Sequence, residues 1–363
     1  MSKTTTSRAL RPASLVLSGL ILSACQTGLD QNLSSTLETE ALSIPADWQT
    51  EAGTTDLAAD WIDLFDDAQL RDYLLQAEAE NLDLRLAEAR LRQSEASLRQ
   101  SRALLGPSVS ADFSASGVAE LADFNETSDS ASGVLSASWD PDLFGVNRAT
   151  VREAEARLQV QQANNERLRR IILAQTARAY FQIIEADQQL MLAQENFTFL
   201  EETKRVSEAR FESGDIARSD LALAELEFEN AVAGLRNQEF AARSARRALS
   251  IILGEYGDVE IDVADGLPAP SDLGRYPVPS GLLSTRYDVR AAQAAIAVEF
   301  ANFEATRKAN WPNLRLSGRI ASSGAELADL FDPDFYIASL TASIGAVIFD
   351  SGRNTAQIDS AQA

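Results

Sequence analysis

The sequence predicts a mainly α-helical protein that adds four β-strands of membrane type, and it predicts that this arrangement is internally duplicated. Three observations indicate this fold class. Long stretches without Pro or Gly have helical periodicity, and alternating apolar and polar residues follow Pro107. The same change from helix to alternating strand recurs at Pro312, 205 residues later (312 − 107). A fixed offset of this kind indicates duplication.

The composition excludes several classes of function. The chain has 363 residues, a formal net charge of −22, no His and one Cys. A nucleic-acid partner would need a basic surface, so none is expected. The acids are spread along helix faces, and the commonest metal ligand and general base is absent. We therefore expect no enzyme activity, no metal and no cofactor.

Residues 1–24 have the layout of a secretory signal. A basic start precedes an apolar run from Ala13 to Leu22, which is too short to cross a bilayer. The run leads into Ser23-Ala24-Cys25, and Leu22 to Cys25 resembles the lipobox of bacterial lipoproteins. That resemblance implies that Cys25 becomes the first mature residue and carries acyl groups in the outer membrane. An ordinary signal peptide with a chance Cys is the alternative.

Two helices are predicted next. The first reaches about Glu80, with Asp66 or Asp67 as its N-cap, and the second runs from Leu82. Leucines recur every seven residues on the second helix, as in a coiled coil: Leu84, Leu91, Leu98 and Leu105. Any helical core would give the same stripe, so this pattern does not by itself indicate a membrane protein.

The alternating segments favour the membrane interpretation. Apolar positions alternate with serines in two runs: Val109, Ala111, Phe113 and Ala115, then Leu135, Ala137 and Trp139. Each run suits a strand of about nine residues, close to the ~9–11 that cross a bilayer at a tilt. An acidic loop near 120–129 is expected between them. Trp139 and Phe144 are expected at the membrane interface, where aromatic rings gather.

A long helical hairpin follows. The segment from Asn147 to Phe211 contains neither Pro nor Gly, so it predicts one helix of about 100 Å. Gly214 suits the C′ position after that helix because glycine adopts positive φ. Ser219 or Asp220 is expected to start the returning helix. Gly214 and Asp220 therefore lie at the predicted tip of the hairpin.

The second copy repeats the first. Matched pairs stand 205 residues apart: Leu84 and Val289, Leu98 and Phe303, Pro107 and Pro312, Phe144 and Phe349, Arg148 and Arg353. Trp311 and Phe349 are the expected interface aromatics of this copy. Gly145 and Gly352 are expected to mark each return from strand to helix. The predicted segments are a signal (1–24), an extended segment (25–60), a first unit (61–253), a linker (254–281) and a second unit (282–363).

Five further stretches resemble the TolC family of outer-membrane factors, in its lipoprotein branch. They are 61–70, 139–145 (Trp-Asp-Pro-Asp-Leu-Phe-Gly), 211–221, 282–290 and 347–353 (Val-Ile-Phe-Asp-Ser-Gly-Arg). Tyr287 departs from the family, which usually has Pro there. The resemblance implies a channel for small molecules in the outer membrane of a Gram-negative bacterium. Its implied partners are a periplasmic adaptor (membrane fusion) protein and an inner-membrane RND-type drug-efflux pump.

Oligomerisation also follows from the strands themselves. Four strands cannot close a membrane barrel, since the smallest have about eight, and lipid does not tolerate an open edge. The resemblance implies a homotrimer with a twelve-stranded barrel, continued by an α-helical coiled-coil barrel across the periplasm. It also assigns the family's gating acid to Asp220, by its spacing from Gly214. A simple helix cap is the alternative role for Asp220.

The duplication also predicts what a complete second copy would contain. The equivalent of the first hairpin would extend from 353 to about 458 (253 + 205), whereas the sequence ends at Ala363. We expect the second hairpin in the roughly 95 residues that are absent. Alternatives to efflux are type I protein secretion, a periplasmic adaptor and a coiled-coil lipoprotein. The acidic balance predicts a modest cation preference in full-length channels.

Overall fold

The computed structural model describes residues 65, 67–120, 123–256, 260–268 and 285–362. The predicted signal, Cys25 and the extended segment 25–60 lie outside these residues. The described elements are α2 (Ala68–Glu80), α3 (Leu82–Ala103), β1 (Ser108–Glu120), β2 (Asp123–Trp139), α4 (Val146–Glu212), α5 (Arg218–Ile252), α7 (Tyr287–Lys308), β3 (Asn313–Gly324), the 3-10 helices η2 (Leu327–Phe331) and η3 (Pro333–Phe335), β4 (Ile337–Gly345) and α8 (Arg353–Gln362).

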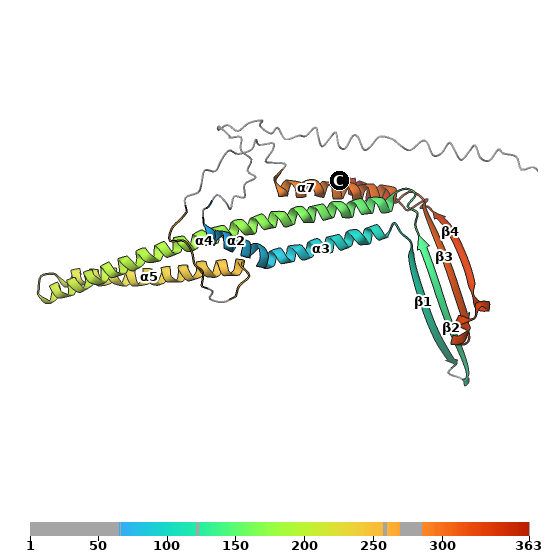
Figure 1. Cartoon of the computed structure of the whole chain (residues 1–363), viewed down its shortest axis with the longest axis horizontal. Coiled ribbons are helices and arrows are strands. Elements are labelled where there is room, and N and C mark those ends of the chain that lie inside the picture. The colour runs from blue at the N-terminus through green and yellow to red at the C-terminus, as the bar shows by residue number, and fades with distance from the viewer. Residues whose placement is uncertain (1–64, 66, 121–122, 257–259, 269–284, 363) are drawn as a thin grey trace, which may run out of the picture.

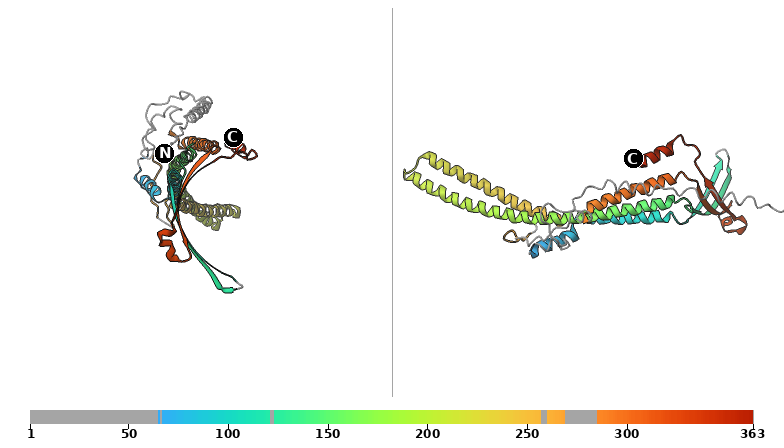
Figure 2. Two further views of the ribbon diagram at one scale, coloured as in Figure 1. Left: turned by 90° about the vertical axis from the view of Figure 1, so that its right-hand side faces the viewer. Right: turned by 90° about the horizontal axis from the view of Figure 1, so that it is seen from above.

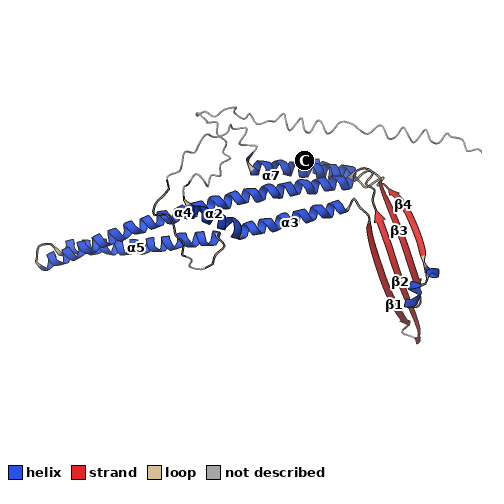
Figure 3. Cartoon of the chain, in the orientation of Figure 1, coloured by secondary structure: helices blue, strands red, loops and turns tan. Residues whose placement is uncertain are grey.

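The molecule is elongated, with a helical shaft and a β-sheet at one end (Figure 1). Helix α4 runs the length of the shaft; α5 packs along one half of it, and α3 and α7 pack along the other half. The four antiparallel strands follow the order β1-β2-β3-β4 and leave the shaft at a steep angle (Figure 3). Seen end-on in Figure 2, the strands form one curved wall.

The structure confirms the predicted fold class and the duplication of the helix before each strand. Helices α3 and α7 differ by 205 residues at both ends, since 82 + 205 = 287 and 103 + 205 = 308. Their buried faces nevertheless differ. Helix α3 buries Leu84, Ala87 and Leu98, whereas α7 buries Ala291, Ala294, Val298 and Ala301. The smaller residues of α7 suit a close approach to α4, against which it packs.

The prediction of an acidic loop between the first two strands was wrong. Strand β1 extends to Glu120 and β2 begins at Asp123, so the strands have 13 and 17 residues instead of about nine. In the second copy β3 and β4 have 12 and 9 residues, and the acidic segment between them forms η2 and η3. The copies therefore diverge where the hairpins leave the predicted membrane region.

The main core lies midway along the shaft, where α2, α4 and α5 meet. Tyr180 is fully buried there and donates a hydrogen bond from its hydroxyl to Asp67 Oδ2, at 2.7 Å. The same hydroxyl accepts a hydrogen bond from the Ala264 backbone N–H at 3.0 Å. Burial and the Asp67 carboxylate raise the pKa of Tyr180 to about 12, so the phenol remains a donor at neutral pH. Asp67, rather than Asp66, is the N-cap of α2.

Part of the predicted linker belongs to this core. Ile261 is only 4% exposed and joins the cluster that contains Leu249 and Leu253. Val263 and Ala264 pack on neighbouring core side chains. Residues 260–268 therefore run along the packed core, and the remainder of the linker that lies outside the described residues carries no structural conclusion.

Helix α5 ends in a Schellman motif that fits closely against α2. Gly254 has φ +77°, and its N–H and that of Glu255 donate to the carbonyls of Ile251 and Ser250. A Cβ atom on Gly254 would lie 2.7 Å from the backbone oxygen of Glu80. Both the positive φ and the close approach therefore require glycine here.

We expect Gly254→Ala to lower the free energy of unfolding by about 2–4 kcal/mol, because a left-handed residue and a steric overlap add together. Gly214→Ala is the matched control, since Gly214 has φ +81° but nothing within 4 Å of its Cβ position. That control should cost only about 1–2 kcal/mol. Chemical denaturation of the detergent-solubilised protein measures both, and equal losses would contradict the proposed contact with Glu80.

Candidate membrane sheet and helix–strand junction

The strand register gives the sheet one apolar face. Val109 pairs with Ala137, Ala111 with Leu135, Leu135 with Ile320, and Ala137 with Gly318. The apolar face is therefore continuous across all four strands: Val109, Ala111, Phe113 and Ala115 of β1; Ala131, Gly133, Leu135, Ala137 and Trp139 of β2; Leu314, Leu316, Gly318 and Ile320 of β3; Ala338, Leu340, Ala342 and Ile344 of β4.

Most of the large residues of this apolar face are exposed. Phe113 is 76% exposed, Leu340 is 88% exposed and Ile344 is 70% exposed, so the face is not a protein core within one chain. Its rows extend over about ten residues, or about 33 Å along the strands at ~3.3 Å per residue. A tilt of ~40° reduces that height to about 25 Å, which matches the apolar band of outer-membrane barrels.

The opposite face of the sheet is polar. Serine hydroxyls pair across β1 and β2 in a ladder, with Oγ–Oγ distances of 2.8, 2.8, 2.8 and 2.9 Å: Ser108 with Ser138, Ser110 with Ser136, Ser114 with Ser132, and Ser116 with Ser130. On β3 and β4 the same face carries Arg315, Ser317, Arg319, Ser339, Thr341 and Ser343. The sheet therefore has an apolar and a polar side along its whole width, and β1 and β4 form its two edges.

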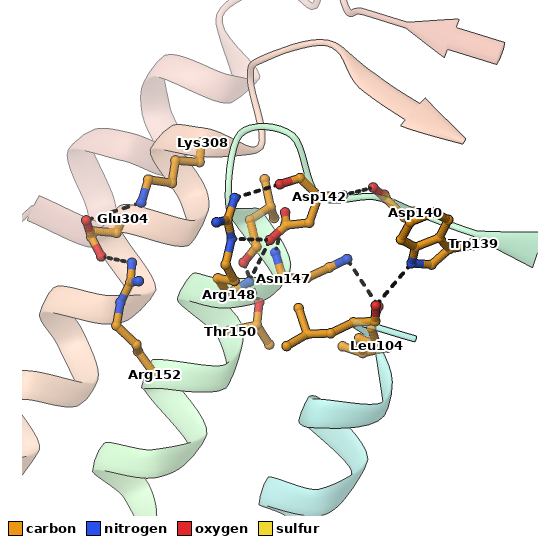
Figure 4. Close-up of polar contacts among 12 residues, drawn as sticks. Leu104, Trp139, Asp140, Asp142, Asn147, Arg148, Thr150, Arg152, Glu304 and Lys308 are labelled. Carbon is orange, nitrogen blue, oxygen red and sulfur yellow. Dashed lines mark hydrogen bonds and ion pairs between the residues drawn. The ribbon is translucent and has the colours of Figure 1, made fainter. Parts of the chain in front are cut away.

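The chain turns from α3 into β1 through Gly106 and Pro107. The last carbonyls of a helix lack partners within the helix, and here side chains of the returning chain bind them (Figure 4). Trp139 Nε1 donates to the Leu105 oxygen at 3.0 Å, and Asn147 Nδ2 donates to the Leu104 oxygen at 3.5 Å. The junction at Pro107 is thus fastened to the junction at Gly145.

Asp142 organises the return from β2 to α4. Its carboxylate accepts hydrogen bonds from the backbone N–H groups of Asn147 and Arg148, both at 3.0 Å, and from Arg148 Nε at 3.2 Å. Burial would raise the pKa of Asp142, but these hydrogen bonds and the Arg148 charge outweigh it and lower the pKa. Gly145, with φ +78°, is the residue before α4. Sequence reasoning missed Asp142, although the motif Asp-Pro-Asp ahead of a helix start is a capping signal.

The second return turn is built differently. The carboxylate of Asp350 accepts from the N–H groups of Gly352 and Asn354, at 3.1 and 2.9 Å. Gly352, with φ +88°, precedes α8, so the two turn glycines stand 207 residues apart (352 − 145) and not 205. The offset predicted from sequence therefore fails at this turn. A carboxylate caps the helix in both copies, but from different positions in the chain.

The predicted interface aromatics fall into two groups. Phe144 and Trp311 stack with ring centroids 5.4 Å apart, and so join the return turn of the first copy to the hinge before Pro312. Trp139 binds the α3 end as described, and Phe349 is 85% exposed. All four side chains are at least 40% exposed and lie next to the ends of the strands. This arrangement suits an aromatic belt at a lipid–water boundary.

Ion pairs brace the two copies just below the junction (Figure 4). Glu304 of α7 bonds Arg152 of α4 and also Lys308, whose Nζ lies 3.3 Å from it. Burial would raise the pKa of Glu304, but the two cations outweigh it and lower the pKa. On the other side, Arg170 of α4 lies 4.7 Å from the ring centre of Tyr287. The unusual tyrosine at that position therefore contacts α4.

The far end of the shaft is the hairpin between α4 and α5. Gly214, with φ +81°, occupies C′ of a Schellman motif in which Asp215 N–H donates to the Arg210 oxygen at 2.8 Å. The predicted start of the return helix was two residues late or more, because α5 begins at Arg218. Asp220 lies at N3, and its carboxylate accepts the Ala217 N–H at 3.2 Å. That contact is half of a capping box.

The structure describes no other site that suggests chemistry. Of the described helices, none combines the length and the hydropathy that a membrane crossing requires. In the same part of the chain, no group of three or more Asp, Glu, His or Cys residues could hold a metal ion.

A two-faced sheet that continues into a helical shaft defines a channel-forming class of membrane protein. A family model described as outer membrane efflux protein matches residues 74–255 and 278–363. The chain therefore belongs to the outer membrane efflux protein family, and the outer membrane is its location. The relatives with solved structures include outer-membrane channels.

Relatives of known name agree with this family. The pyoverdine export outer membrane protein OpmQ of Pseudomonas aeruginosa is 29% identical over 375 residues, covering 96% of this chain and 75% of that protein. The cation efflux system protein CusC of Escherichia coli K12 is 26% identical over 311 residues, covering 84% and 67%. The chain thus spans about two thirds to three quarters of the length of these relatives.

Solved structures show the same fold. The crystal structure of the Campylobacter jejuni CmeC outer membrane channel superposes with a TM-score of 0.73 at 21% identity, covering 89% of this chain and 69% of that one. The Neisseria gonorrhoeae MtrE outer membrane channel, in its open state, gives a TM-score of 0.68 at 26% identity, covering 88% and 75%.

Proposed function

We propose that the chain is one subunit of a homotrimeric efflux channel. Three four-stranded sheets would join edge to edge, β4 of one copy beside β1 of the next, and close a twelve-stranded barrel. The helical shafts would continue the barrel as a tunnel in the periplasm. A periplasmic adaptor and an inner-membrane RND-type pump would deliver small molecules to it, and acyl groups on Cys25 would add a lipid anchor.

The register of the sheet is the observation that carries this proposal. Its apolar face would meet lipid, its polar face would line the water-filled lumen, and its two edges need partners because lipid offers none. The steep angle between sheet and shaft supports a boundary at the junction. Pro107, Gly145, Pro312 and Gly352 would then lie at the periplasmic edge of the membrane, with Trp139, Phe144, Trp311 and Phe349 in the interface.

Reconstitution into planar bilayers tests the channel. The purified chain should form a trimer that resists dissociation in SDS before heating, and it should give discrete conductance steps. Partner binding is tested separately, by co-purification with a cognate adaptor. A monodisperse monomer that never conducts, from membranes or after refolding in detergent, would contradict the proposal.

For the hairpin tip we propose a gating role of Asp220, beside its capping contact with Ala217. Asp220→Asn separates the two roles, because the amide oxygen can still accept the Ala217 N–H while the charge is lost. We expect Asp220→Asn to increase the time that the channel spends open, as measured in single-channel recordings. Asp215→Asn, at the same tip but outside the cap, is the control. Unchanged opening in Asp220→Asn would leave only the capping role.

A further inference from the structure

Two arginines of β3, Arg315 and Arg319, lie on the polar face of the sheet and are exposed. The register places Arg319 between Ser136 of β2 and Ser339 of β4, and it places Arg315 opposite Ser343. Within the described part of the chain, neither guanidinium makes a hydrogen bond or an ion pair. Both are therefore available to a ligand.

The depth of Arg319 determines the environment that it meets. Its chain neighbours Gly318 and Ile320 belong to the middle rows of the apolar face. An arginine on the lipid side at this depth would be strongly unfavourable. Because successive strand residues point to opposite faces, Arg319 faces the lumen side at mid-membrane level. Arg315 is four residues nearer the shaft, or about 13 Å along the strand.

The polar face carries more positive than negative charge, although the chain as a whole has a net charge of −22. Among the polar-face side chains at 108–117, 129–139, 313–324 and 337–345, the only carboxylate is that of Asp112. Asp112 lies on β1, two strands from Arg319, and pairs with Val134. The other neighbours of the two arginines are mainly hydroxyls, which neutralise no charge and can donate hydrogen bonds to an anion.

We propose that Arg315 and Arg319 form an anion-binding band on the lumen wall, which favours passage of small solutes carrying carboxylate, sulfonate or phosphate groups. The inference rests on the proposed function, since three copies would place six guanidinium groups around one lumen. A guanidinium binds an oxyanion through two parallel N–H donors. Ser136 and Ser339 flank Arg319 with further donors. The cation preference expected from net charge would then apply to the acidic helices and not to the barrel.

The test uses tripolyphosphate as the probe in single-channel recordings of the reconstituted protein, added to each side of the bilayer in turn. We expect it to reduce the wild-type current in a concentration-dependent way. In Arg315→Ser/Arg319→Ser the half-blocking concentration should rise about tenfold or more, because charge-assisted hydrogen bonds are lost. Both replacements are already common residues on this face, so the sheet should still assemble.

Two controls make the outcome specific. Arg315→Lys/Arg319→Lys keeps the charge and should retain block, and Asp112→Ser should retain or strengthen it. A neutral sugar of similar size should block wild type and the serine variant equally. Channels that conduct normally, but respond identically to tripolyphosphate with and without the two arginines, would overturn the anion-binding band and leave the channel function intact. A protein that forms no channels would instead contradict the proposed function.

Discussion

Replacing Leu340 by arginine is expected to prevent the chain from assembling in the outer membrane. Leu340 pairs with Gly318 in a middle row of the apolar face and is 88% exposed in the single chain. Arginine at the lipid side near the membrane midplane costs about 2–4 kcal/mol in each subunit. Three subunits would bear that cost together. The fraction of the protein in SDS-resistant trimers from isolated outer membranes measures the effect.

Thr341→Arg is the matched control for Leu340→Arg. Thr341 is the next residue of β4, and it lies on the polar face opposite Ser317. Its replacement adds the same side chain at nearly the same depth but on the lumen side, so trimers should persist. If both variants assembled equally well, the apolar face would not contact lipid. An exposed position in water would tolerate either substitution within about 0.5 kcal/mol.

The second large effect is expected for Asp142→Ala. The carboxylate side chain is 7% exposed, and it holds two backbone N–H groups and Arg148 at the start of α4. Removing it leaves those donors without an acceptor, so we expect a loss of about 2–4 kcal/mol in the free energy of unfolding. Asp350→Ala should cost less, because Asp350 binds two N–H groups and the structure gives it no ion pair. Denaturation in detergent compares the two variants directly.

The pH dependence of the Asp142 contribution follows from its lowered pKa. The stabilisation is present above the ordinary carboxyl pKa of 3.8, and it is lost as pH falls through the lower value of the folded protein. The difference in stability between wild type and Asp142→Asn should therefore shrink on acidification below pH 3.8. A difference that stays constant from neutral pH into that range would contradict the ionised contact with Arg148.

The sequence predicted the features that depend on local periodicity. Alternation with a period of two assigns residues such as Leu316 and Leu340 to one face without knowledge of the partner strand. The fixed offset of 205 residues likewise located both ends of α7 from those of α3. Gly214 was placed correctly because only the backbone conformation after a helix was needed.

Features that depend on distant partners could not be predicted in this way. The stacking of Phe144 on Trp311 joins residues 167 positions apart (311 − 144), and no local signal connects them. The acidic segment after Ser116 suggested a loop, yet strand pairing continues through it because β1 and β2 extend each other's ladder beyond the apolar band. The role of Asp142 was missed because its partners become neighbours only when the turn at Gly145 forms.

Accessibility of single cysteines along β4 tests most directly whether this sheet separates lipid from a water-filled lumen. Cysteines are introduced one at a time from 338 to 344 and labelled in isolated outer membranes with a water-soluble maleimide, with the parent protein correcting for Cys25. Ser339, Thr341 and Ser343 should label when replaced, whereas Ala338, Leu340, Ala342 and Ile344 should be protected. Uniform labelling of all seven positions, or protection of the polar-face positions instead, would contradict the membrane sheet and the channel built from it.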